Sequence, residues 1–280
     1  MIAAEVYKHP YRICNPDGDL QFIILCDHAT NAIPPGYHNL GLTDDQLAQH
    51  IAWDIGAAKT AEMIGDRLDC PVILAGFSRL LIDANRGIDD PTLVMQLSDG
   101  EVIEGNLDIH PARQCAEKKT RISGFYEPYH AQIEHYLQQA EAAGKVPIIL
   151  SVHSFTPFWK EQKRPMPAAI LWDKDDRLPR HIEQKILAFQ AQADARFQGP
   201  VAHNDPYSGQ LKYDTLYRHG TANGLPHALI ELRQDLVTQA QDCQQWAQIM
   251  VAALQAAAVD SACQSRHYYG SVCDAPNEQP

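Results

Sequence analysis

Short apolar runs that end in polar residues constrain the fold of this chain more than any other feature. Such runs occur at 20–28 (LQFIILCDH), 146–155 (VPIILSVHSF) and 227–232 (HALIEL), and each indicates a buried strand. The segments at 124–144 and 234–257 instead show the spacing of apolar residues that is typical of helices. Strands that alternate with helices predict one α/β domain around a largely parallel sheet.

The remaining elements are read in the same way. The sequence TDDQ resembles a helix-capping box, with Thr43 as the N-cap and Gln46 at the third helical position. A helix is therefore expected from Thr43 to about Leu68. Residues 87–122 are polar and indicate a long excursion or lid. Further strands are expected at 70–78 and 166–173, a strand or strand edge at 79–86, and a further helix at 175–192.

Composition and charge bound the class of protein. The 280 residues include 23 Lys and Arg against 35 Asp and Glu, a net charge of −12, which gives no general footprint for nucleic acid or an anionic membrane. No apolar stretch approaches the ~20 residues that cross a bilayer, and no signal-peptide pattern opens the chain. Seven cysteines without CxxC pairs suit a reducing compartment. We expect a cytoplasmic protein, with one domain over 1–258 and a flexible C-terminal tail at 259–280.

Three expected strands each carry a polar residue at the carboxyl end. These residues are His28, His153 and Glu231. Because ligand sites in such sheets collect at the carboxyl ends of strands, the three side chains can reach one crevice. Two histidines and a carboxylate are a common set of zinc ligands in catalytic sites. The alternative, two half-buried histidines that each bind one hydrogen-bond partner, stays open on the residues alone.

A third metal ligand has two candidates. Asp54 lies seven residues after Leu47, near the middle of the apolar stripe of the expected helix, where an ionised carboxylate needs a partner or a metal. Asn31 lies three residues after His28 and is the rival. An amide is a poorer zinc ligand than a carboxylate, so Asp54 is preferred. A buried ion pair is the alternative role for Asp54.

The segment SRLLIDANRG is unusually polar for an apolar stretch. Arg79, Asn85 and Arg86 lie in it, and a guanidinium group matches a carboxylate through two parallel hydrogen bonds. We expect this segment to hold the acidic end of a substrate. The alternative is a structural pair between Asp83 and one of the two arginines.

Glu231 and Arg233 lie in the segment ELRQDL. A glutamate beside an activated water can act as a general base and then as an acid toward a leaving amine. The alternative is a helix-start charge. In the segment YEPYH, Tyr129 and His130 are expected to be a packed aromatic residue and a surface histidine. The chain contains no GxSxG, GxGxxG, GxxxxGK[ST] or HExxH motif, so serine-hydrolase, nucleotide-binding and zincin chemistry have no support.

Six motifs in a fixed order resemble the N-formylglutamate amidohydrolase family. They are DHATNAIP, HIAWDIGA, SRLLIDANR, PYH, LSVHSFTP and LIELRQDL, over about residues 20–240. The resemblance implies a mixed, mainly parallel sheet with helices on both faces, similar to zinc carboxypeptidases. It also implies a metal-dependent hydrolase that cleaves the amide of an N-acylated acidic amino acid such as N-formylglutamate.

The resemblance assigns roles to residues of this chain. His28 and His153 are expected to be ligands of Zn²⁺ or another divalent metal, and Glu231 is expected to be the catalytic glutamate. Arg79 is expected to bind substrate or stabilise an oxyanion. Asn85 and Arg86 are expected to be the pair that holds the substrate carboxylate. Apart from the resemblance, Asn31 and Arg233 are also expected to bind substrate, and 87–122 and 207–214 are expected to shape the acyl pocket. The partner is a small anionic substrate. Competing hypotheses are a hydrolase of another N-acyl amino acid or small peptide, and a non-catalytic binder of an acidic metabolite.

Overall fold

A seven-stranded mixed sheet forms the centre of the described part of the chain. The computed structural model describes residues 10–109 and 115–274. The strand order is β1-β3-β2-β6-β11-β9-β10, and every neighbouring pair is parallel except β1–β3 and β11–β9. The predicted mixed, mainly parallel α/β sheet is confirmed. The strands are β1 (Tyr11–Cys14), β2 (Phe22–Cys26), β3 (Val72–Ala75), β6 (Ile148–Phe155), β9 (Ala168–Leu171), β10 (Val201–His203) and β11 (His227–Arg233).

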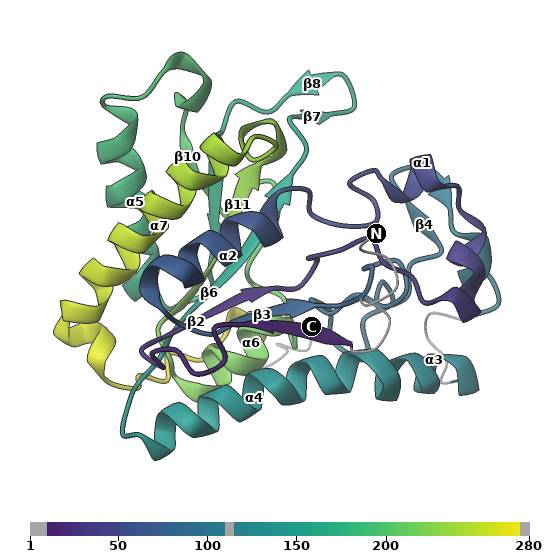
Figure 1. The fold of residues 1–280 in the computed structure, drawn as a ribbon, viewed down its shortest axis with the longest axis horizontal. Coiled ribbons are helices and arrows are strands. Elements are labelled where there is room, and N and C mark those ends of the chain that lie inside the picture. Colours follow the sequence, from purple (N-terminus) through teal and green to yellow (C-terminus); the bar gives the residue numbers. More distant parts are fainter. Residues whose placement is uncertain (1–9, 110–114, 275–280) are drawn as a thin grey trace, which may run out of the picture.

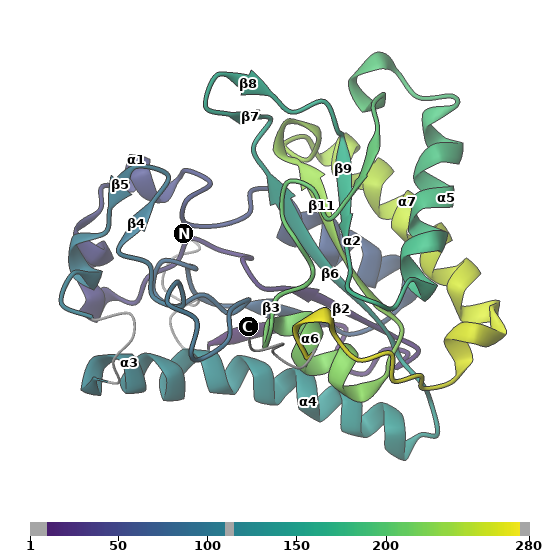
Figure 2. The ribbon, with the colours of Figure 1, turned by 180° about the vertical axis from the view of Figure 1, so that it is seen from behind.

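Helices cover both faces of this sheet (Figure 1). One face carries α2 (Ala57–Leu68), α5 (Arg177–Gln190) and α7 (Ala240–Val259), whose apolar side chains share one core cluster with the sheet. The other face carries α4 (Glu127–Ala142) and α6 (Thr215–His219), which pack in a second cluster; Figure 2 shows α4 below β3 and β2. Burial on both faces explains why the central strands are continuous apolar runs. No helix in the described ranges is both long and apolar enough to span a membrane.

The expected helix over 43–68 is wrong in its middle. Thr43 and Gln46 do form the capping box, but α1 ends after four residues, at Leu47 (Asp44–Leu47). Residues 48–56 are irregular because their backbone groups bond to other segments: the N–H of Asp54 donates to His28 O at 2.9 Å, and Ala52 O accepts from Ser78. Asp54 therefore faces inward from a loop rather than from a helix.

The segment 79–86 forms consecutive turns and not the expected strand. Its backbone bonds are local or lead to the following loop, as from Leu81 N–H to Ser78 O and from Asp83 N–H to Leu93 O. Chain reversals here place Asp83 and Asn85 near the carboxyl ends of the strands. The edge strands β1 and β10 were not expected, because each is short and only half-buried.

Residues 87–122 contain the hairpin of β4 (Leu97–Ser98) and β5 (Glu101–Val102), followed by α3 (Ala116–Arg121). Residues 110–114 lie outside the described part. A second hairpin, β7 (Phe158–Trp159) with β8 (Gln162–Lys163), follows β6 and projects beyond its carboxyl end.

The segment expected to be a flexible tail packs against the domain up to Asp274. Arg177 donates to the carbonyl groups of Ala262 and Ser265, and the N–H of His267 donates to Gly224 O. Residues 275–280 lie outside the described residues.

A pair of buried histidines joins α4 to α6. His130 was expected at the surface, but its side chain is fully buried. Its Nε2 lies 3.0 Å from Ala84 O, and its Nδ1 lies 2.8 Å from Nε2 of His219. Because a carbonyl only accepts, His130 carries its proton on Nε2 and accepts at Nδ1 from His219. Burial, with the charge of Arg218, lowers the pKa of His130 to about 3.

Gly56 should not tolerate a side chain. Its φ is +85°, and a Cβ there would lie 2.2 Å from Val237 O. Left-handed backbone and a clash with fixed backbone together predict that Gly56→Ala lowers the free energy of unfolding by about 3 kcal/mol. Chemical denaturation measures this loss. The matched control is Gly124→Ala, at an exposed helical position with nothing within 4 Å of the new Cβ, which should be neutral or stabilising. Equal effects of both substitutions would contradict the prediction.

His130 should make folding stability depend on pH. Its folded pKa is about 3 and the unfolded pKa is about 6.5, so below the unfolded value only the unfolded chain binds the proton. This group therefore costs stability as pH falls, by about 2 kcal/mol at about pH 5. Urea titrations at about pH 7 and pH 5 should show that His130→Gln loses about 2 kcal/mol less than the wild type over this interval. His135→Gln, on the exposed face of the same helix, should behave like the wild type.

Candidate metal centre and active site

A pocket of about 290 Å³ opens at the carboxyl ends of β2, β6 and β11. His28 follows β2 by two residues, while His153 and Glu231 lie directly opposite each other on the neighbouring parallel strands β6 and β11. Paired residues on adjacent strands present their side chains to the same face, which places this glutamate beside the histidines. The pocket is lined by the expected residues His28, Asp54, Arg79, Asn85, Arg86, His153 and Glu231.

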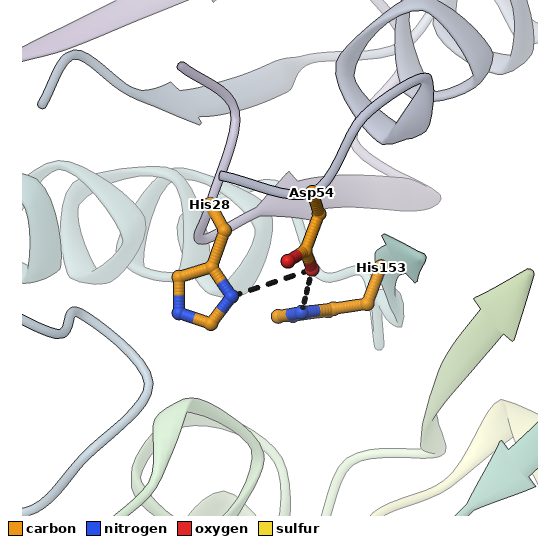
Figure 3. A group of neighbouring side chains, drawn as sticks. All are labelled: His28, Asp54 and His153. Atoms are coloured by element: carbon orange, nitrogen blue, oxygen red, sulfur yellow. Dashed lines mark hydrogen bonds and ion pairs between the residues drawn. The ribbon is translucent and has the colours of Figure 1, made fainter. Parts of the chain in front are cut away.

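His28, Asp54 and His153 converge on one point (Figure 3). Oδ2 of Asp54 lies 3.3 Å from Nδ1 of His28 and 2.7 Å from Nδ1 of His153. The two imidazole rings are nearly perpendicular, with centroids 4.8 Å apart. All three side chains are buried. One ligand atom from each residue lies within 4.8 Å of the others, which is compatible with binding to a single ion.

A further carboxylate lies on the far side of each imidazole ring. Nε2 of His28 lies 2.7 Å from Oδ1 of Asp83, and Nε2 of His153 lies 2.9 Å from Oδ2 of Asp27. Carboxylates accept hydrogen bonds, so each ring carries its proton on Nε2. The lone pairs of both neutral Nδ1 atoms then face the lone pairs of Asp54. This repulsion is relieved only by a cation or an extra proton, so the donor set fits a divalent metal.

The charges around the histidines also favour a cation between the two rings. Burial alone would lower the pKa of His153, but hydrogen bonds and the charges of Asp27 and Asp54 raise it to about 10. Burial would raise the pKa values of Asp27 and Asp54, but the imidazole rings hold both below the usual range. The same is true of Asp83, where Arg79 contributes beside His28. The carboxylates therefore favour positive charge between the two rings, which a bound metal ion would supply.

Glu231 has one carboxylate oxygen without a partner. Its Oε2 is buried and has no hydrogen bond within the described structure. Burial, assisted by the charge of Asp54 and opposed by His153, raises the pKa of Glu231 to about 7. A carboxyl group with a pKa near neutrality, held beside a cation site, can accept a proton and return it.

Arg79 and the pair Asn85–Arg86 occupy another wall of the pocket. Arg79 donates to Asp54 at 3.4 Å and to Asp83 at 3.1 Å, so the structural arginine–aspartate pair weighed from the sequence is present. Its side chain is still 21% exposed. Oδ1 of Asn85 accepts from the N–H of Thr215, which leaves the amide nitrogen to donate to a ligand.

Asn31 and Arg233 are not brought into this pocket. Asn31 donates from its side chain to Leu47 O at 2.8 Å and lies outside the lining. Arg233 pairs with Asp235 and donates to Arg164 O and Met166 O, which ties neighbouring chain segments together. Both side chains have structural partners in place of a ligand.

Sequence reasoning missed Asp27 as a residue of the site. Asp27 accepts from Tyr129, Ser151 and Thr215 as well as facing His153, so it organises much of the pocket floor. The sequence could have indicated Asp27, because a carboxylate that directly follows a buried apolar strand needs hydrogen-bond or charge partners.

Two loop segments were expected to shape the pocket. Residues 207–214 contribute five lining residues: Tyr207, Ser208, Gly209, Leu211 and Asp214. The described part of 87–122 contributes none. It reaches the pocket through Asp99, whose carboxylate lies 3.1 Å from Nε2 of the lining residue His50.

Comparison with known proteins adds to this geometry. A family model of N-formylglutamate amidohydrolase matches residues 20–238. The solved structure of a gene product of Agrobacterium tumefaciens aligns with TM-score 0.80 and 29% identity, over 92% of this chain and 98% of that chain. An N-formylglutamate amidohydrolase from Ralstonia eutropha aligns with TM-score 0.56 and 18% identity, over 89% and 97%. A putative carboxypeptidase A from Shewanella denitrificans aligns with TM-score 0.37 and 12% identity, over 89% and 60%.

No match to this chain was found among curated proteins. The family model nevertheless covers most of the chain, and the motifs quoted from the sequence lie within the matched range. The chain therefore belongs to the N-formylglutamate amidohydrolase family.

Proposed function

We propose that this protein is a metal-dependent amidohydrolase that cleaves the amide of an N-acylated acidic amino acid such as N-formylglutamate. The observation that carries the proposal is the pair of inward-facing Nδ1 atoms around Asp54, each fixed by a carboxylate behind the ring. Family membership supports the reaction class. A non-catalytic binder would not require the unpartnered, buried carboxylate oxygen of Glu231 beside this site.

His28, Asp54 and His153 are the residues that would hold the metal. A zinc ion bound there would activate a water molecule and polarise the substrate carbonyl. Asp27 and Asp83 orient the two rings, and such outer partners typically contribute 10–100-fold in metal affinity or activity.

Glu231 is the proposed proton carrier. Its pKa of about 7 lets the carboxylate take a proton from the attacking water and return it to the leaving nitrogen. Arg79, which lines the same pocket, is placed to stabilise negative charge on the carbonyl oxygen. Arg79 is held by Asp54 and Asp83, and the backbone of Glu231 is fixed by the pairing of β11 with β6, so little reorganisation is needed at the moment of reaction.

Asn85 and Arg86 are the proposed clamp for the substrate carboxylate. Arg86 donates from Nη1 to Asn85 O and from Nε to Thr92, so its guanidinium is fixed and Nη2 remains for a ligand. The guanidinium of Arg86 thus provides local positive charge for the substrate carboxylate in a protein whose net charge is negative.

A second candidate substrate class is an amino acid with a longer acyl group. Phe155, Leu171, Leu211 and Leu229 line the same pocket and offer more apolar surface than a formyl group can cover. A panel of N-acyl glutamates of increasing chain length, assayed with zinc-loaded protein, distinguishes the two classes through kcat/KM.

Substitution of a proposed metal ligand and of the proposed proton carrier should have different effects on metal binding and turnover. His153→Ala should lose bound metal and activity together, because it removes a ligand. Glu231→Gln should keep the metal and lose at least about 100-fold in kcat, because it removes the proton carrier but preserves the shape. Elemental analysis and hydrolysis of N-formyl-L-glutamate measure both. A chelator should abolish wild-type activity, and Zn²⁺ should restore it.

The control is Glu183→Gln, a half-buried glutamate on α5 that pairs with His203 outside the pocket and should change neither quantity. Absence of stoichiometric metal from the wild type, with no hydrolysis of any N-acyl amino acid after zinc addition, would overturn the proposed function.

Arg86→Ala should weaken substrate binding through the carboxylate. Loss of a charge-assisted hydrogen bond of about 1.5–3 kcal/mol predicts a roughly 10–150-fold higher KM. A substrate whose α-carboxylate is replaced by an amide should show the same penalty with the wild type and little further penalty with the variant. Arg180→Ala, an exposed arginine on α5, is the matched control. Additive penalties would show that Arg86 does not contact this carboxylate.

A further inference from the structure

Three metal-ligating side chains from separate elements meet at the C-terminal end of α7. His181 lies on α5, Asp260 directly follows α7, and Cys263 lies in the short helix η8 (Ser261–Gln264). Nε2 of His181 is 3.0 Å from Oδ2 of Asp260, and one ligand atom from each of the three residues lies within 4.8 Å of the others. Two atoms that each bind Zn²⁺ at 2.0–2.3 Å are at most about 4.6 Å apart, so small side-chain rotations close this set around one ion.

This cluster is remote from the pocket. The helix α7 begins shortly after the carboxyl end of β11 and runs back for 20 residues, about 30 Å. Its far end, at the lower left of Figure 1, therefore lies toward the amino-terminal ends of the parallel strands. The pocket opens at the opposite ends of the same strands.

The chain holds two of the three ligands in place before any ion binds. Oδ1 of Asp260 accepts from the N–H of Ala262 at 3.0 Å, which fixes the carboxylate and turns Oδ2 toward His181. The N–H of Cys263 donates to Asp260 O at 2.9 Å. Arg177 donates to the carbonyl of Ala262 and so anchors the same turn to α5.

The chemistry of the three donors selects the kind of ion. Cys263 is fully buried, and its thiol has no hydrogen-bond partner in the part of the chain that the structure describes. The other two side chains are partly exposed, 16% for His181 and 32% for Asp260, so an ion has a route of entry. Thiolate, imidazole and carboxylate together suit Zn²⁺ and similar transition metals, whereas Mg²⁺ and Ca²⁺ prefer oxygen ligands alone.

We propose that His181, Asp260 and Cys263 form a second, structural site for a zinc-class transition metal that fastens α5 to the end of α7. The site is independent of the proposed catalytic centre. Its ion joins two helices that lie on the same face of the sheet and are otherwise held by apolar contacts and the Arg177 hydrogen bonds.

Titration of the metal-free full-length protein with Co²⁺ tests this site directly. A thiolate bound to Co²⁺ produces a charge-transfer absorption band, and the pocket set of His28, Asp54 and His153 contains no sulfur. The band therefore reports on the second site whether or not the pocket binds metal. The wild type should show the band with one cobalt ion at this site, and His153→Ala should keep it.

Two variants should remove the band. Cys263→Ser removes the sulfur ligand, and Asp260→Asn keeps the capping oxygen for Ala262 but replaces the carboxylate ligand. Each should bind one cobalt ion fewer than the wild type. Cys273→Ser changes a half-exposed cysteine outside the cluster and should leave the band intact. If Cys263→Ser fails to fold, as judged by circular dichroism, Asp260→Asn decides the question. No band in the wild type, or a band that persists in Asp260→Asn, overturns the second site.

Discussion

The site depends on one constraint: the Nδ1 lone pairs of His28 and His153 both point at the carboxylate of Asp54. Asp27 and Asp83 fix the protons of His153 and His28 on the far side of each ring, so the near nitrogens must share a positive charge. A core that buries such a cluster is costly unless every group has a partner. The hydrogen bonds from Tyr129, Ser151 and Thr215 satisfy that requirement for Asp27.

The fold supplies this arrangement through parallel strands held in register. His153 and Glu231 are paired across β6 and β11, so a slip of one residue would turn one of them to the other face of the sheet. Asp54 and Asp83 come from loops that are bonded to other loops, as from Asp54 N–H to His28 O and from Asp83 N–H to Leu93 O. Rigid strands thus place the histidines and the glutamate, and cross-bonded loops bring the carboxylates to them.

The alternation of apolar runs and helical segments was sufficient to predict the central strands, the long helices α4, α5 and α7, and the gathering of His28, His153 and Glu231. Asp54 was predicted correctly to face the interior, but from a helix that does not exist there. A capping box predicts where a helix begins. The early end of α1 depends instead on bonds of the following residues to distant segments, from Asp54 N–H to His28 O and from Ser78 to Ala52 O. Asn31 and Arg233 were misplaced in the pocket for a related reason: a polar side chain near a ligand in sequence can satisfy itself on the backbone.

The eight residues of the turns at 79–86 have two roles: some contact Asp54 and His28, and others line the pocket. Arg79 and Asp83 contact Asp54 and His28, respectively, while Asn85 and Arg86 line the pocket. Any sequence change that reshapes ligand preference there also shifts the groups that orient His28. Evolution of new specificity in this segment is therefore expected to be strongly epistatic, so relatives with altered preference should diversify first in 207–214, which lines the pocket from a separate loop.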